Sequence, residues 1–294
     1  MTQRNGYPDG APCWADLNTP DLPGARRFYG GLLGWTFDEA DPEFGHYTMA
    51  RVHGGTVAAI APKQPGEDMP SVWSVYLKSG DIDATARRIT AEGGRLLVEP
   101  MDIPGSGRML FGFDPTGAAF GVWQPGGHRG AERFDEPGAM CWHEINTRDG
   151  ARADGFYGAL FSYEQQQIGD GAKFDYTMWS IDGHPVAGRL QMTEEWHGIP
   201  PHWSTYFVVE NCDDSVKLAA ELGGKLCQGP FDSPHGRIAV INDPWGATFS
   251  IIQRPPAAAC SAPLRAARRA AALAGARSTG MRPIELRPRR AQVP

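Results

Sequence analysis

The sequence predicts an α+β fold of four βαβββ modules arranged in two tandem halves. A strand-and-helix pattern, PCWADLNTPD followed by FYGGLLGW, returns later in the chain as MCWHEINTRD followed by FYGALF. The tryptophans at 14 and 142 lie 128 positions apart, and so do the phenylalanines at 28 and 156. The Asp-Pro pair at 114–115 returns after 129 positions. A long repeat that keeps its spacing indicates two copies of one domain.

The repeated segment itself reads as a strand and a helix. After a short strand and a polar break at residues 18–21, Asp21 stands where the side chain of a helix N-cap accepts hydrogen bonds from free backbone amides. The helix that follows carries Ala25, Phe28 and Leu32 at the spacing of one apolar face.

The rest of the first half continues the same module pattern. Alternating residues on both sides of the glycines at 54–55 predict a hairpin. A second module then begins with a strand over 72–77 and a helix over 81–92. Three further strands are expected at 95–98, 108–113 and 119–123, and the second half matches them. We therefore expect a first domain at 1–125, a linker at 126–138, a second domain at 139–255 and a tail at 256–294.

Composition narrows the class of protein. With 294 residues, 41% of them hydrophobic, and a net charge of -6, the chain is typical of a globular protein. It contains neither a signal-peptide hydrophobic region nor an apolar run of the roughly 20 residues that a membrane span needs, so we expect a cytoplasmic protein without a membrane partner. Five cysteines without a Cys-x-x-Cys pair argue against a zinc knuckle or a disulfide framework. Cys13 and Cys141, at equivalent strand positions, are expected to be buried thiols.

The tail has the opposite charge to the rest. Eight arginines and one acid follow residue 255, so the tail has a net charge of +7 and the residues before it have a net charge of -13. This Ala/Arg/Pro-rich segment predicts a basic disordered tail. It lacks the interleaved aromatic residues of a nucleic-acid platform, so nucleic acid is not an expected partner.

The doubled modules, the FYGxLxGW segment and the Asp-Pro-x-Gly turn together resemble the vicinal oxygen chelate (VOC) superfamily, which includes glyoxalases, bleomycin-resistance proteins and extradiol dioxygenases. The resemblance covers about residues 11–254. Within the superfamily the chain looks like two-domain actinobacterial members, some of which accompany the biosynthesis of aromatic polyketide (anthracycline-like) antibiotics. The resemblance implies two tandem VOC domains, each with a cupped mixed sheet around a small-molecule cavity.

The resemblance also implies four strand positions for the ligands of a divalent metal in each half. These positions fall on Trp14 and Trp142, Ser74 and Ser204, Gly121 and Ser250, and about Ala58 and Gly188. Because such a metal needs imidazole, thiolate or carboxylate donors, we expect no metal and no cofactor. A strand register shifted by one residue would instead turn Cys13 or His143 inward, and His202 and His235 could then be further ligands. In that case a metal-dependent enzyme would again be possible.

Aromatic residues and acids stand where the metal would be. The two-residue period of a strand puts Asp16 on the same face as Trp14, and Glu144 on the same face as Trp142. Planar walls suit a planar ligand, and a carboxylate suits a cationic amine. The candidate ligand-binding residues are Trp14, Asp16, Ser74, Tyr76, Trp123, Trp142, Glu144, Trp179, Trp196, Ser204 and Tyr206.

The sequence favours metal-independent binding of a hydrophobic, polycyclic aromatic small molecule. The role would be sequestration of an antibiotic, self-resistance, or assistance in antibiotic biosynthesis. The alternative is a glyoxalase- or dioxygenase-like enzyme (a lyase, isomerase or oxygenase), in which Asp16 or Glu144 could serve as a metal-free general base. A third reading is a scaffold whose cavities are filled by its own side chains. Homodimerisation is left open, and the catalytic residues stay unassigned.

Overall fold

A computed structural model describes residues 2–40, 42, 45–63, 70–172 and 174–255. Residues 1–254 form one compact unit. The basic tail expected at 256–294 lies outside the described residues. No helix in the described ranges is long and apolar enough to cross a membrane.

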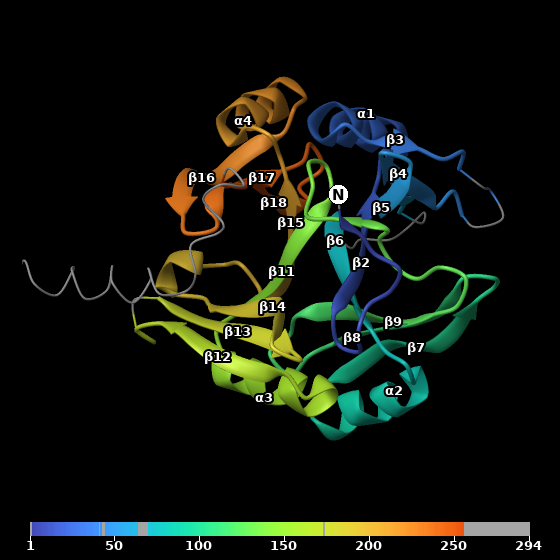
Figure 1. Cartoon of the computed structure of the whole chain (residues 1–294), viewed down its shortest axis with the longest axis vertical. Coiled ribbons are helices and arrows are strands. Elements are labelled where there is room, and N and C mark those ends of the chain that lie inside the picture. Colours follow the sequence, from blue (N-terminus) through green and yellow to red (C-terminus); the bar gives the residue numbers. More distant parts are fainter. Residues whose placement is uncertain (1, 41, 43–44, 64–69, 173, 256–294) are drawn as a thin grey trace, which may run out of the picture. The chain divides into compact units, whose positions relative to one another are not determined.

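The α+β fold is confirmed, with one eight-stranded mixed sheet for each half (Figure 1). The first sheet has the order β3-β4-β5-β2-β6-β9-β8-β7. Its strands are β2 (Pro12–Thr19), β3 (Thr36–Phe37), β4 (Thr48–Val52), β5 (Gly55–Pro62), β6 (Val72–Lys78), β7 (Arg95–Ile103), β8 (Gly107–Phe113) and β9 (Ala119–Pro125).

The second sheet repeats this order as β12-β13-β14-β11-β15-β18-β17-β16. Its strands are β11 (Met140–Thr147), β12 (Glu164–Gly169), β13 (Asp175–Ile181), β14 (His184–Gln191), β15 (His202–Val208), β16 (Lys225–Ser233), β17 (Gly236–Asn242) and β18 (Thr248–Gln253). A small two-stranded sheet pairs β1 (Thr2–Gln3) with β10 (Arg133–Phe134), and a short 3₁₀ helix, η2, covers Glu194–Trp196.

Each module contributes one helix, and each helix begins at a side-chain cap. The helices are α1 (Leu22–Leu33), α2 (Ile82–Ala91), α3 (Gly150–Phe161) and α4 (Cys212–Glu221). The predicted cap at Asp21 is confirmed, because its Oδ1 accepts a 2.9 Å hydrogen bond from the amide of Gly24. Across the two halves, α1 packs beside α4 and α2 packs beside α3 (Figure 1).

The register of the two central strands decides which residues share a face. In the first sheet Asp16 pairs with Ser74 on one side and with Ala59 on the other. The residue beside this acid is therefore Ala59, one position beyond the expected Ala58. In the second sheet Glu144 pairs with Ser204 and with Gly188.

Candidate ligand-binding site

Two buried tryptophans show which face of each sheet is covered by helices. Trp73 on β6 donates a 3.1 Å hydrogen bond to the hydroxyl of Tyr29 in α1, and Trp203 on β15 donates a 2.9 Å bond to the hydroxyl of Tyr157 in α3. Because successive strand residues point to opposite faces, the residues at 74, 76, 204 and 206 point away from the helices. We call this helix-free face the first cup in the first sheet and the second cup in the second sheet.

The first cup contains a hydrogen-bonded chain of three side chains. The indole Nε1 of Trp14 donates to the hydroxyl of Tyr47 at 2.7 Å, and that hydroxyl donates to Oδ2 of Asp16 at 3.0 Å. The other carboxylate oxygen, Oδ1, is buried without a hydrogen-bond partner. Burial raises the pKa of Asp16 to about 6. Hydrogen bonds from the hydroxyls of Tyr47, Tyr76 and Ser74 act in the opposite direction but do not cancel the effect of burial.

The first cup is closed by the chain that links the two halves. The ring of His128 lies 4.3 Å from the Trp14 ring and 5.6 Å from the Trp123 ring, centroid to centroid. Its carbonyl accepts a 2.9 Å hydrogen bond from Nε1 of Trp123. In this cup Trp14, Ser74 and Tyr76 are only 3%, 7% and 8% exposed. This half matches the reading in which a cavity is filled by the protein's own side chains.

The second cup repeats the hydrogen-bonded aromatic residues around an acid. Nε1 of Trp142 donates to the hydroxyl of Tyr176 at 2.8 Å, and the hydroxyl of Tyr206 donates to Oε1 of Glu144 at 2.7 Å. Burial raises the pKa of Glu144, while the Tyr206 and Tyr176 hydroxyls oppose the shift.

The second cup differs from the first because its walls are open. Trp142, Tyr176, Ser204 and Tyr206 are all half-buried, whereas Glu144 at their centre is 6% exposed. A face with accessible aromatic side chains around a buried carboxyl group can hold an apolar planar molecule and orient a polar group on it.

One end of the second cup is polar, and sequence reasoning missed its main residue. The amide Nδ2 of Asn146 donates to the hydroxyl of Ser204 at 2.8 Å and lies 3.5 Å from Nε2 of His202. Trp196 in η2 lies beside His202, with 6.2 Å between the ring centroids. Arg148 donates hydrogen bonds to the carbonyls of Trp196 and Ile199, which fixes this loop.

Tyr47, Tyr176 and His128 were also missed. The two tyrosines lie 129 positions apart, close to the period of the repeat, so the repeat could have shown them. His128 stands in the linker, where no strand or helix pattern indicates its direction.

The slipped register considered for a metal site is absent. His143 is 1% exposed and its Nδ1 lies 3.3 Å from the hydroxyl of Thr205, which shares the helix-covered face with Trp203. Burial lowers the pKa of His143 to about 3. Trp179 also lies away from the second cup. It is wholly buried, stacks on Tyr163, and donates a 2.8 Å hydrogen bond from Nε1 to Oδ1 of Asp154.

The residues of both cups do not fit a divalent metal. A Cβ atom added at Gly121 would overlap the ring of Tyr76, and one added at Gly188 would overlap the ring and hydroxyl of Tyr176. Tyrosine side chains therefore occupy the space that a ligand side chain from either position would need. Within the described residues, no group of three His, Cys, Asp or Glu side chains is placed to hold a metal ion.

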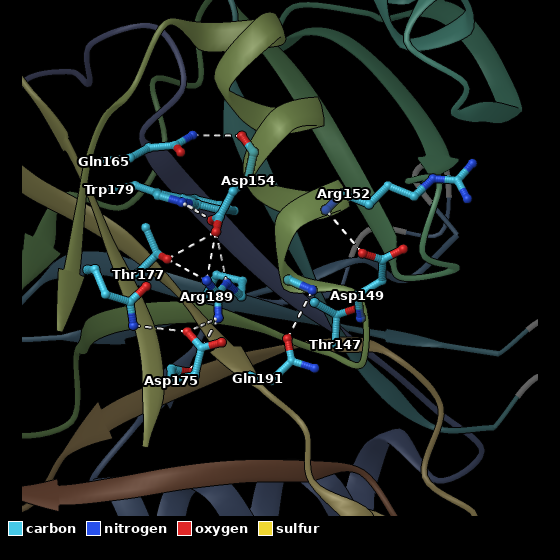
Figure 2. Close-up of polar contacts among 12 residues, drawn as sticks. Thr147, Asp149, Arg152, Asp154, Gln165, Asp175, Thr177, Trp179, Arg189 and Gln191 are labelled. Carbon is cyan, nitrogen blue, oxygen red and sulfur yellow. Dashed lines mark hydrogen bonds and ion pairs between the residues drawn. The ribbon is translucent and has the colours of Figure 1, made fainter. Parts of the chain in front are cut away.

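A buried ion-pair cluster holds the β13-β14 hairpin, which carries Tyr176 and Gly188, against α3 (Figure 2). Arg189, 4% exposed, donates from Nη2 to Oδ2 of Asp154 at 2.7 Å and from Nη1 to Oδ1 of Asp175 at 2.8 Å. The hydroxyl of Thr177 also donates to Asp154 at 3.0 Å. The first half has Ile60 and Arg26 at the positions of Arg189 and Asp154, so this support belongs to the second cup alone.

Two surface cavities lie away from the candidate residues. One, of about 150 Å³, lies between the start of α2 and the end of α3 and is lined by Asp81, Arg88 and Ser162, among others. The other, of about 410 Å³, is formed by the β7-β8 turn and the start of the linker. Neither is lined by a predicted ligand-binding residue.

Comparison with known proteins agrees with this architecture. A model of the Glyoxalase/Bleomycin resistance protein/Dioxygenase superfamily matches residues 13–122. The chain is 40% identical over 261 residues to the anthracycline biosynthesis protein DauV of Streptomyces sp. (strain C5), covering 84% of this chain and 94% of that protein. It is 37% identical to CFP32 of Mycobacterium tuberculosis (strain CDC 1551 / Oshkosh), provisionally named a glyoxylase, covering 87% of this chain and 99% of that protein.

Solved structures show the same fold at low identity. The Mn(II)-bound glyoxalase from Novosphingobium aromaticivorans superposes with a TM-score of 0.59 at 17% identity, covering 84% of this chain and 82% of that one. The 2,3-dioxygenase LapB from Pseudomonas sp. KL28 gives a TM-score of 0.57 at 13% identity, covering 86% of this chain and 96% of that one.

Proposed function

We propose that this chain, which belongs to the glyoxalase/bleomycin resistance protein/dioxygenase superfamily, binds a planar, polycyclic aromatic small molecule in its second cup without a metal. The observation that carries the proposal is the contrast between the two cups. Trp142 and Tyr206 are half-buried beside Glu144, whereas their equivalents Trp14 and Tyr76 are 3% and 8% exposed and the ring of His128 packs on Trp14.

The chemistry of the second cup supports this class of ligand. Indole and phenol faces bind planar aromatic molecules by offset stacking, which contributes about 0.5–1.5 kcal/mol per ring pair beyond area burial. The buried ion-pair cluster around Arg189 fixes the hairpin that carries Tyr176, so one wall is formed before the ligand arrives.

The relatives suggest a biological setting. DauV is named for anthracycline biosynthesis, and anthracyclines are built on a polycyclic aromatic ring system. We assign this chain an accessory role of the same kind, in which it holds such a metabolite during biosynthesis or sequesters it.

A metal-free enzyme is the second candidate, and one contact favours it. Glu144 is buried, its pKa is raised, and its Oε1 accepts a hydrogen bond from Tyr206. A carboxyl group in such a setting can take or return a proton of a bound ketone or phenol. This activity needs the same bound molecule, so binding is the first property to measure.

A titration with a hydroxyanthraquinone tests the proposal. Binding should quench tryptophan fluorescence at micromolar or better affinity, about -8 kcal/mol, and a chelator should leave the affinity unchanged. Trp142→Ala should weaken binding at least about tenfold, because the stacking wall is lost. Recovery of the probe with an altered mass or isomer pattern would favour the enzyme instead.

Trp14→Ala is the matched control, since Trp14 has the same hydrogen-bond pattern in the closed first cup. It should leave the affinity near that of the parent protein. If Trp142→Ala binds like the parent, or if Trp14→Ala loses as much affinity as Trp142→Ala, the second cup is not the site.

A further inference from the structure

We propose that Asn146 is the hydrogen-bond acceptor that selects the ligand, and that the bound molecule carries a neutral hydroxyl group on the edge of its aromatic rings. This inference rests on the proposed function, since it places the molecule in the second cup.

The first observation is an unpaired amide oxygen. Asn146 is 1% exposed, and its Oδ1 has neither solvent contact nor a hydrogen-bond partner in the described structure. Its Nδ2 already donates to Ser204. A buried acceptor left unpaired costs about 1–3 kcal/mol, and native proteins leave few such groups. A donor on the ligand would remove this cost.

The second observation is the position of that oxygen. Asn146 pairs with His202 across the sheet and lies two residues beyond Glu144, which itself lies two residues beyond Trp142. All three therefore point into the second cup. A rigid aromatic molecule stacked on Trp142 and Tyr176 would present its edge to Asn146.

The surroundings favour a neutral donor over a charged one. Burial lowers the pKa of His202, so this ring is neutral near pH 7. Oε1 of Glu144, the group that the sequence suggested for an amine, already accepts from Tyr206. An ammonium group would have to lose its water to reach Asn146, whereas a hydroxyl loses much less.

The first half supplies a matched comparison. Asn18 is the equivalent of Asn146, but it is half-buried and pairs with Val72, where the second half has His202. A change at Asn18 thus alters the same residue type at the same strand position without touching the second cup.

Three related probes test the inference: a hydroxyanthraquinone, its methyl ether, and unsubstituted anthraquinone. Binding is measured by calorimetry at a pH at which the phenol is protonated. The parent protein should bind the hydroxyl compound about tenfold more tightly than the methyl ether, as expected for about 1.4 kcal/mol from one paired buried acceptor. Asn146→Leu should abolish this preference, so that the hydroxyl compound and its methyl ether bind with similar affinity. Asn18→Leu should keep the preference.

The outcomes separate the inference from the proposed function. If the parent binds all three probes equally, or prefers the methyl ether, the role of Asn146 is overturned and the binding function stands. If the parent binds none of them, both are overturned. Should Asn146→Leu fail to fold, Asn146→Ala replaces it, and a preference for the hydroxyl compound that persists in the alanine variant overturns the inference.

Discussion

The hydroxyl of Tyr29, in the first helix, donates a 3.0 Å hydrogen bond to Oδ2 of Asp243, which opens the Asp-Pro turn of the opposite half. The second half returns the contact, because the hydroxyl of Tyr157 donates to Oδ2 of Asp114 at 3.2 Å. The two sequence motifs that reveal the repeat are thus bonded to each other across the halves. The pairing explains why both motifs occur together and keep their spacing.

Removing one of these hydroxyls should destabilise the whole protein. Tyr29→Phe leaves the carboxyl group of Asp243, which is 3% exposed, without its tyrosine donor. We expect a loss of about 1–3 kcal/mol in the free energy of unfolding, measured by urea denaturation. Tyr7→Phe is the control, since the Tyr7 hydroxyl donates only to the carbonyl of Ala131 and a neutral pair contributes about 0.5–1.5 kcal/mol. Unfolding in two separate steps would contradict the interlocking of the halves.

Breaking the ion-pair cluster under the second cup should be more costly. Asp154→Ala removes the carboxylate that accepts from Arg189, Thr177 and Trp179, and leaves a buried guanidinium with Asp175 alone as its ionic partner. A loss of about 3–5 kcal/mol is expected. Asp83→Ala, which breaks an exposed pair with Arg108, should change the midpoint of denaturation little. Equal effects of the two variants would show that the cluster contributes nothing beyond a surface pair.

The carboxyl group of Asp16 should make stability depend on pH in a defined direction. Its pKa is raised to about 6 in the folded protein from 3.8, so the folded state binds this proton more tightly than the unfolded state does. The stabilisation that Asp16 provides is therefore complete at pH values below its pKa in the unfolded chain. It is lost as the pH rises through its pKa in the folded protein. The loss amounts to about 3 kcal/mol between about pH 4 and about pH 6.

Comparison with Asp16→Asn isolates this group from the other buried acids. The difference in unfolding free energy between the parent and the variant should fall across that interval and stay level on either side of it. A difference that does not change with pH would mean that the pKa of Asp16 is not raised in the folded protein.

The glycine beneath Tyr76 should tolerate no side chain. Gly121→Ala forces the tyrosine ring to move, and overpacking of this kind costs about 1–3 kcal/mol. Gly155→Ala is the matched control, because its Cβ would meet open space on α3, where alanine favours the helix by up to about 1 kcal/mol. The two variants should move the melting temperature in opposite directions, and a shift in the same direction would contradict the packing of Tyr76.

The fold could be predicted almost completely, since the repeat, the helix cap and the alternation of Trp142 and Glu144 are all encoded locally. Side-chain direction on the strands followed from the two-residue period, and so did the pairing of Trp14 with an acid on one face. The position of Trp179 could not be predicted, because it depends on Asp154 in a helix that packs on the sheet. The same holds for His128, which reaches the first cup from a linker without periodicity, and for Asn146, whose unpaired oxygen is visible only in three dimensions.

The tyrosines that lie over Gly121 and Gly188 prevent a single substitution from placing a side chain at either position without rearrangement. A side chain introduced at either position would meet an aromatic ring in the space its first carbon needs. A metal ligand at either glycine therefore requires two changes, one to a smaller residue at Tyr76 or Tyr176 and one at the glycine itself. Each single step disturbs the hydrogen bonds of a cup before any benefit can appear.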